Sequence, residues 1–293
     1  MVENCPVCGG HTSSLMLCDN CGFDGSRNYE AHMTLGPVSS GIRSLGGMRL
    51  DYKCKHQSRT TYVNITAQRL FASANTAQSD EERIRALEQS ALLGYAPAQC
   101  ALGKYYFSLG NGFEKDAAKA VEWFWKAADQ DNADAKYWLG LCYFGGIGVL
   151  QSDIDAVRWF LLAAKQEHPE AQYHLAKCYA SGRGVLPSKE TAVYWYRRAA
   201  ARGNVNAQIC MGDCCLTEFG IEQDIPQATE WYRRAAKQGH PFGLYYLGIC
   251  YKDGNFVRRN KVKAIELLNE AAAFGSGPAK EALKYLYLSS KYP

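Results

Sequence analysis

The segment AVYWYRRAA at residues 192–200 decides the fold, because variants of it occur along the chain at a constant spacing. Each variant begins with Ala and ends with an Ala-Ala pair, and consecutive copies start 36 residues apart. A fixed period of this length is the signature of a repeat architecture, in which each unit packs on its neighbours. The five copies are AVEWFWKAA (120–128), AVRWFLLAA (156–164), AVYWYRRAA (192–200), ATEWYRRAA (228–236) and AIELLNEAA (264–272).

A second series with the same period lies between these segments. Examples are ALGKYY from Ala101, WLGLCYFGGIGV from Trp138 and LGICYKDG from Leu247. Apolar and small residues fall on one face at helical spacing, so each unit predicts two helices, A and B, joined by a Gly-rich loop. Small residues of helix A, such as Gly140, let the two helices approach closely. We expect tryptophans at one helix B position to pack against these small residues: Trp159, Trp195 and Trp231.

The spacing and residue types of these units resemble the Sel-one-like repeat family, whose units are slightly longer than the related tetratricopeptide repeats. The resemblance covers about two thirds of the chain and implies an all-α fold, a right-handed α/α superhelical solenoid with a concave groove lined by helix A. Five repeats are expected over residues 96–277. The fourth departs at Glu218 and Phe219, where other units have Gly, and the fifth has Leu267 in place of Trp.

The segments around the array predict smaller elements. Residues 61–95 are expected to form a degenerate first hairpin, because Ser79 and Glu82 have the spacing of a capping box that opens a helix. Residues 278–293 predict a capping helix from Pro278 to about Ser289. Residues 25–60 have no helical period and are expected to be a linker or a short β segment, with a strand pair formed by MRLDYKC and TTYVNI.

Two Cys-x-x-Cys pairs near the N-terminus predict a metal site. Cys5, Cys8, Cys18 and Cys21 supply four thiolates on two tight knuckles, each followed by Gly, as tetrahedral zinc requires. Four cysteines leave no coordination position for water, so a structural Zn²⁺ is expected rather than a catalytic one. We interpret residues 1–24 as a small zinc ribbon, with another metal, a redox pair or a catalytic site as the alternatives. Cys54 and His56 are left without an assigned role.

A separate column of cysteines repeats with the helices, at Cys142, Cys178, Cys214 and Cys250. No second column exists in helix B, and neighbouring helices lie about 8–10 Å apart, which is too far for disulfides between equivalent positions. We therefore expect buried, reduced thiols. The N-terminus has no basic and apolar leader, and no apolar run approaches the ~20 residues of a membrane helix. These features favour a cytoplasmic protein that does not bind membranes.

The groove is the predicted interaction surface. The resemblance to tetratricopeptide repeats suggests that residues two before and two after the helix A Leu face it. An apolar strip with aromatic anchors is typical of a site for an extended peptide, and Lys177 would favour an acidic group on that peptide. The alternative is that these side chains belong to the core or are covered by residues 24–60. The expected contacts are Tyr137, Leu141, Phe144, Tyr173, Lys177, Ile209, Tyr245 and Ile249.

These features predict a protein–protein interaction scaffold and not an enzyme. No catalytic motif of the common hydrolases, nucleotide-binding proteins or zinc proteases is present, and the net charge of +4 is too small to indicate nucleic-acid binding by itself. One alternative is a nucleic-acid-associated protein that uses the ribbon and the helix B arginines, among them Arg197 and Arg233. Another is a β-lactam-binding hydrolase, an activity reported for some members of the family, although no residues carry over for it.

Overall fold

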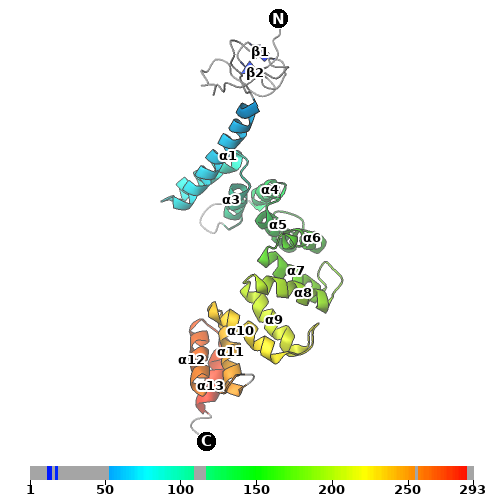
Figure 1. Cartoon of the computed structure of the whole chain (residues 1–293), viewed down its shortest axis with the longest axis vertical. Coiled ribbons are helices and arrows are strands. Elements are labelled where there is room, and N and C mark those ends of the chain that lie inside the picture. Colours follow the sequence, from blue (N-terminus) through cyan, green and yellow to red (C-terminus); the bar gives the residue numbers. More distant parts are fainter. Residues whose placement is uncertain (1–11, 15–16, 19–52, 109–116, 255–256, 289–293) are drawn as a thin grey trace, which may run out of the picture. The chain divides into compact units, whose positions relative to one another are not determined.

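The computed structural model of the chain describes residues 12–14, 17–18, 53–108, 117–254 and 257–288 (Figure 1). The chain divides into two compact units, residues 1–95 and 96–293. In the first unit, two short strands pair antiparallel, with Thr12 opposite Cys18. Two helices of the same unit pack against each other. The elements of this unit are β1 (Thr12–Ser14), β2 (Leu17–Cys18), α1 (Lys53–Thr76) and α2 (Asp80–Leu92).

Helix α2 begins as the capping box predicts. The Ser79 hydroxyl accepts the backbone N–H of Glu82 at 3.2 Å, and the Glu82 carboxylate accepts the backbone N–H of Gln78 at 3.4 Å. The Ser90 hydroxyl donates to the Ala67 carbonyl at 2.6 Å and joins α2 to α1. The strand proposed for TTYVNI is wrong, because residues 60–65 lie inside α1. The sequence of this segment has no helical period of apolar residues, so it gave no signal for a helix.

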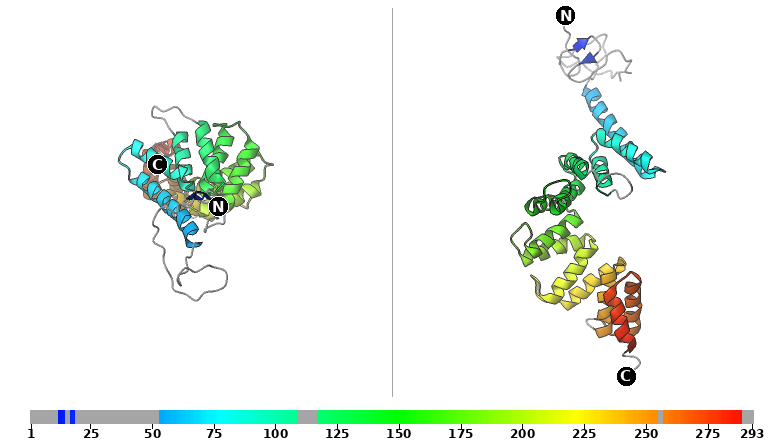
Figure 2. Two further views of the ribbon diagram at one scale, coloured as in Figure 1. Left: turned by 90° about the horizontal axis from the view of Figure 1, so that it is seen from above. Right: turned by 180° about the vertical axis from the view of Figure 1, so that it is seen from behind.

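The second unit consists of helix pairs that follow one another in chain order (Figures 1 and 2). Within this unit, each helix from α3 to α12 contacts the next helix along the chain. The described part of this unit is therefore the expected all-α repeat solenoid, and none of the described helices is long and apolar enough to cross a membrane. The A helices are α3 (Ala96–Ser108), α5 (Ala133–Gly145), α7 (Pro169–Ser181), α9 (Val205–Thr217) and α11 (Pro241–Asp253). The B helices are α4 (Ala117–Ala128), α6 (Asp153–Lys165), α8 (Lys189–Ala201), α10 (Ile225–Lys237) and α12 (Lys261–Ala273).

The loop after helix A begins with one left-handed residue in each of the repeats from the second to the fifth. That residue donates its N–H to the carbonyl of the column cysteine, for example Gly182 to Cys178. Glycine adopts this conformation without a steric cost. The fourth repeat uses Glu218 at φ 56°, so a side chain occupies the backbone conformation that glycine has elsewhere.

The contact between helix A and helix B of one pair depends on a glycine and a ring. A Cβ atom on Gly140 would fall 2.5 Å from Phe160, and one on Gly212 would fall 2.4 Å from Tyr232. The helix B residue that faces the small residue of helix A is therefore the one directly after the helix B Trp. Our expectation that Trp159, Trp195 and Trp231 pack there is wrong by one residue.

The tryptophans instead join neighbouring pairs. Trp159 of α6 packs against the core formed by α3, α4 and α5. Its ring meets that of Trp125 on α4 edge to face, with centroids 4.8 Å apart. Trp195 packs against the cores on both sides of its own pair. Two adjacent helix B positions thus have different roles. The Trp packs between neighbouring helix pairs, and the residue after it packs against helix A of its own pair.

The cysteine column lies in the core, as expected. Cys142, Cys178, Cys214 and Cys250 are buried and form no disulfide. Burial raises the pKa of the Cys142 thiol to about 12, so this thiol stays protonated at neutral pH. Protonated, buried thiols are poor nucleophiles and poor metal ligands.

The C-terminal helix α13 (Gly277–Leu288) stands where the next helix A is due and coincides with the expected capping helix within one residue at each end. It buries Leu283 and Leu286 against α11 and α12. Lys284 occupies the position that is small in the repeats, and it is exposed. A charged outer face of this kind is typical of terminal units in repeat proteins.

Candidate interaction surface

The helix A strip is the surface formed by the residues that the sequence assigned to the groove. None of its apolar members is fully buried, and each packs with part of its side chain on a neighbouring core. Tyr137 and Leu141 of α5 pack on the core between α6 and α7, and Tyr173 of α7 packs on the next core along. A side chain held in this way has little rotamer freedom left to lose when it binds a partner. The remaining members are Phe144 on α5, Lys177 on α7, Ile209 on α9, and Tyr245 and Ile249 on α11.

The centre of the strip is aromatic. The His174 ring lies between Tyr137 and Tyr173, with centroid distances of 5.6 and 5.5 Å, and stacks on Phe160 at 5.3 Å. Burial, with a smaller effect of the nearby Lys177 charge, lowers the pKa of His174 to about 4. The imidazole is therefore neutral at neutral pH. Sequence reasoning did not include His174 in the site, although its position beside Tyr173 on helix A was a usable signal.

Phe144 does not belong to the open strip. The Arg183 guanidinium lies 3.5 Å from the centroid of the Phe144 ring and covers it. The same guanidinium donates from Nε to Asp153 at 2.7 Å and from Nη2 to the Phe144 carbonyl at 3.0 Å. This arginine fixes the loop of the third repeat onto the second, and Phe144 is part of that joint.

Two aspartates of the A helices, Asp134 and Asp213, have pKa values that their surroundings shift in opposite directions. The Lys104 ammonium contacts Asp134 of the next helix A at 2.7 Å, and His168 Nε2 lies 3.1 Å from the same carboxylate. The His168 hydrogen bond, with help from Lys104, holds the pKa of Asp134 well below its usual range. Asp213 is half-buried and accepts the Tyr232 hydroxyl at 2.7 Å. Burial raises the pKa of Asp213.

The strip ends in a cavity of about 640 Å³ between α11 and α13. Tyr245 and Ile249 form one wall, and Tyr285 of α13 belongs to the lining opposite. The lining also contains two cations, Lys252 and Arg259, and two acids, Asp253 and Glu281. The cavity therefore extends the apolar strip but does not select for one sign of charge.

The helix B arginines are partly neutralised by glutamates of the same chain. Arg198 and Arg202 both bind Glu167, and Arg233 and Arg234 both bind Glu230. Each pair of guanidiniums shares one carboxylate and keeps one net positive charge, which is a small charge for a phosphate backbone, so the ion pairs add no support to nucleic-acid binding.

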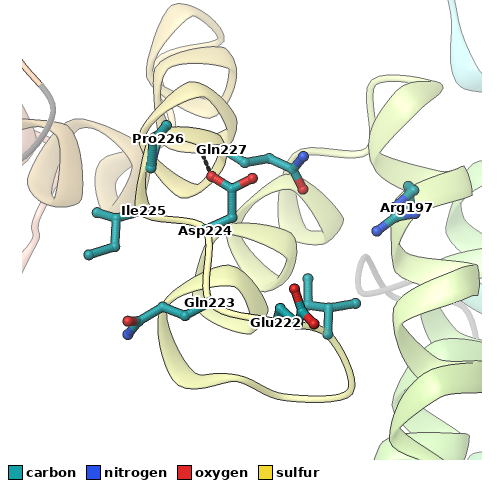
Figure 3. Close-up of a pocket in the computed structure, with 8 residues that line it drawn as sticks. Arg197, Glu222, Gln223, Asp224, Ile225, Pro226 and Gln227 are labelled. Atoms are coloured by element: carbon teal, nitrogen blue, oxygen red, sulfur yellow. Dashed lines mark hydrogen bonds between the residues drawn. The ribbon is translucent and has the colours of Figure 1, made fainter.

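Arg197 is arranged differently. It lines a cavity of about 540 Å³ together with the loop before α10, where Glu222 and Asp224 also belong to the lining. In Figure 3, Arg197 lies across the cavity from Glu222, and one Asp224 oxygen accepts the backbone N–H of Gln227 at 2.9 Å. Acids therefore share this site with the arginine, which again disfavours a polyanion.

Of the predicted zinc ligands, only Cys18 falls within the described residues, where it forms part of β2. Cys5, Cys8 and Cys21 lie outside them. The β1–β2 hairpin follows the first Cys-x-x-Cys pair in the sequence and ends at Cys18, the first cysteine of the second pair.

Comparison with known proteins agrees with this geometry. The Sel1 repeat family matches residues 96–132, 133–168, 169–204, 205–240 and 241–276. The chain belongs to the Sel1 repeat family. Members of this family are generally protein-interaction scaffolds. The family repeats coincide with the helix pairs, each beginning at the first residue of a helix A.

Solved Sel1 structures are similar over most of the chain. A Sel1 repeat protein from Oxalobacter formigenes is 30% identical with a TM-score of 0.70, covering 82% of this chain and 72% of that one. The antigen c5321 of uropathogenic Escherichia coli is 27% identical with a TM-score of 0.55, and the match covers 82% of this chain but 59% of that protein. The immunity protein PA5088 from Pseudomonas aeruginosa, at 16% identity, a TM-score of 0.51 and coverage of 73% and 83%, shares the fold. A search of curated proteins found no match.

Proposed function

We propose that this Sel1 repeat protein is a non-catalytic scaffold that binds a protein partner along the helix A strip. The observation that carries the proposal is the row of partly buried aromatic and aliphatic side chains from consecutive A helices. Their inner parts are fixed by core packing, and their outer parts remain accessible. Tyrosines anchored in this way are frequent hot spots, because little side-chain entropy is lost on binding.

The extent of the strip suits an extended peptide. Equivalent positions on successive A helices recur with every repeat, so an extended chain meets a new anchor on each of them. We place the strongest anchors at Tyr137 and Tyr173, which flank the aromatic centre. Their truncation is expected to weaken partner binding by about 2 kcal/mol each.

The test is affinity capture with the full-length protein as bait in the cells that produce it. Tyr137→Ala combined with Tyr173→Ala should lose the native partner and keep the helical circular dichroism spectrum. The matched control replaces two exposed aromatic side chains outside the strip, Tyr194→Ala with Phe274→Ala, and should retain the partner. Retention by the strip variant, together with loss on charge reversal of Arg197 and Arg233, would move the site to the helix B face.

We also propose that residues 1–24 bind one structural Zn²⁺ through Cys5, Cys8, Cys18 and Cys21. The donor set supports this proposal, because four thiolates suit a closed tetrahedral zinc site. A β1–β2 hairpin that ends at Cys18, the first cysteine of the second pair, is consistent with a ribbon. A reducing, cytoplasmic setting fits both this site and the unpaired thiols of the helical core.

A further inference from the structure

One repeat position on the helix A strip carries a lysine in two of the repeats. Lys104 and Lys177 both stand two residues after the buried helix A Leu. In the first repeat, Lys104 is paired with Asp134, the residue just before the buried Ala of the next helix A. The corresponding residue for Lys177 is Asn206, which stands just before Ala207 on α9. The fourth repeat, which would supply a counterion for Lys177, therefore has the neutral amide of Asn206 at that position.

No other acid of the described chain replaces that counterion. Lys177 is exposed, and its ammonium lies 5.7 Å from the centroid of the Tyr173 ring, with no ion pair or hydrogen bond from Nζ to any described residue. Glu170 on the same helix lies 3.5 Å from His168. Asp213 accepts the Tyr232 hydroxyl. Within the described part of the chain, Lys177 is thus a cation without an ion-pair partner, beside the aromatic centre of the strip.

The surroundings of Lys177 strengthen an interaction with an anion. The partly buried Tyr173 ring lies beside the ammonium, and the Lys177 charge is close enough to contribute to the lowered pKa of His174. An anion bound against these rings would be partly shielded from water, and charges interact more strongly where water is excluded. Neither His174 ring nitrogen makes a hydrogen bond in the described part of the chain, so the neutral imidazole has one N–H to donate.

We infer that Lys177, with the rings of Tyr173 and His174, forms a subsite for a carboxylate side chain of the partner peptide, which takes the place that Asp134 has beside Lys104. This inference rests on the proposed function, because the peptide must lie along the helix A strip. The subsite would therefore favour a peptide in which an Asp or Glu is flanked by aromatic or aliphatic residues that reach the anchors Tyr137 and Tyr173.

A ribosome-displayed library of random 12-residue peptides tests the subsite. Wild-type protein should select peptides with Asp or Glu at one fixed distance from an apolar residue. Lys177→Gln should remove that preference and keep the apolar one. Asn206→Asp should do the same, because the introduced carboxylate occupies the lysine from within the protein. Lys104→Gln is the matched control and should leave the acidic preference unchanged.

Quantitative binding of one selected peptide sharpens the result. Changing its acidic residue to the amide should weaken binding to wild type roughly 3–10-fold at low salt, and much less to Lys177→Gln or Asn206→Asp. Peptides that need Tyr137 and Tyr173 but have no acidic preference would overturn the subsite and leave the scaffold proposal intact. If no selected peptide depends on these tyrosines, the proposed function fails and the subsite fails with it.

Discussion

Gly140 and Phe160 are in such close contact that a Cβ atom on Gly140 would lie 2.5 Å from the ring. Phe160 is fully buried, so the ring has no free space into which it can move. Gly140→Ala is therefore expected to cost about 1–3 kcal/mol, the usual range for overpacking a core. Phe160→Ala should cost about 3–5 kcal/mol through the cavity it leaves.

Urea unfolding of the array measures both changes. Gly277→Ala is the matched control, because an added Cβ there meets nothing within 4 Å. Equal unfolding midpoints for Gly140→Ala and Gly277→Ala would contradict the close contact between the helices of a pair.

Glu218 is expected to be replaceable with a gain in stability. It holds the left-handed conformation at φ 56° that glycine has in the other repeats, and its side chain makes no hydrogen bond or ion pair among the described residues. Glu218→Gly should raise the free energy of unfolding by roughly 0.5–1 kcal/mol, since relief of the left-handed strain exceeds the added entropy of the unfolded chain.

Glu167 provides the comparison for this change. It is also left-handed, at φ 66°, but it binds Arg198 and Arg202. Glu167→Gly loses these ion pairs and should gain less than Glu218→Gly in thermal unfolding. A larger gain at Glu167 would show that the strain argument is wrong for this array.

The stability of the array should fall as the pH falls below about 6.5. The folded pKa of His174 is lowered to about 4, whereas an unfolded His titrates near 6.5. Between these values the unfolded chain binds a proton that the folded chain does not, so acid favours unfolding. The loss from this residue should be roughly 2 kcal/mol between pH 7.5 and pH 5.0.

His174→Phe isolates this contribution, because the phenyl ring fits the same aromatic surroundings and does not titrate. Urea unfolding at both pH values should show a smaller loss for the variant than for wild type. Identical losses would mean that His174 takes up its proton in the folded state without difficulty.

The purified protein should contain one zinc ion per chain. Elemental analysis measures the metal, and a thiol assay confirms that the cysteines are reduced. Cys5→Ser should abolish zinc binding and leave the helical circular dichroism of the array, because residues 96–293 form a compact unit of their own. Metal-free protein with all thiols reduced would exclude the ribbon.

The periodic part of the fold was predictable because the same pattern of apolar and small residues recurs in every repeat. Helix A and helix B of each repeat were predicted without exact bounds, and the closing helix α13 was predicted within one residue at each end. The exact register of helix B was not, because Trp159 and Phe160 are adjacent large aromatic residues and either suits a small partner. Only the structure shows which of the two faces Gly140.

The candidate site was harder to predict than the fold. The sequence placed Phe144 on the open strip, but contact with Arg183 in the next repeat covers its ring. Such contacts join residues about one repeat apart and have no signal in a helical period. The sequence alone does not show that Lys177 has no counterion among the described residues, because the ion pair between Lys104 and Asp134 is seen only in the structure.

The two adjacent aromatic positions of helix B separate two mechanical properties of the array. The residue facing the small position determines how firmly a pair holds itself together, and the Trp before it determines how stiffly that pair is joined to the preceding one. Leu267 replaces this Trp in the last pair, so a smaller side chain forms that joint. The array is therefore expected to flex and open first near its C-terminal end, beside the cavity at Tyr245, while its aromatic centre stays rigid.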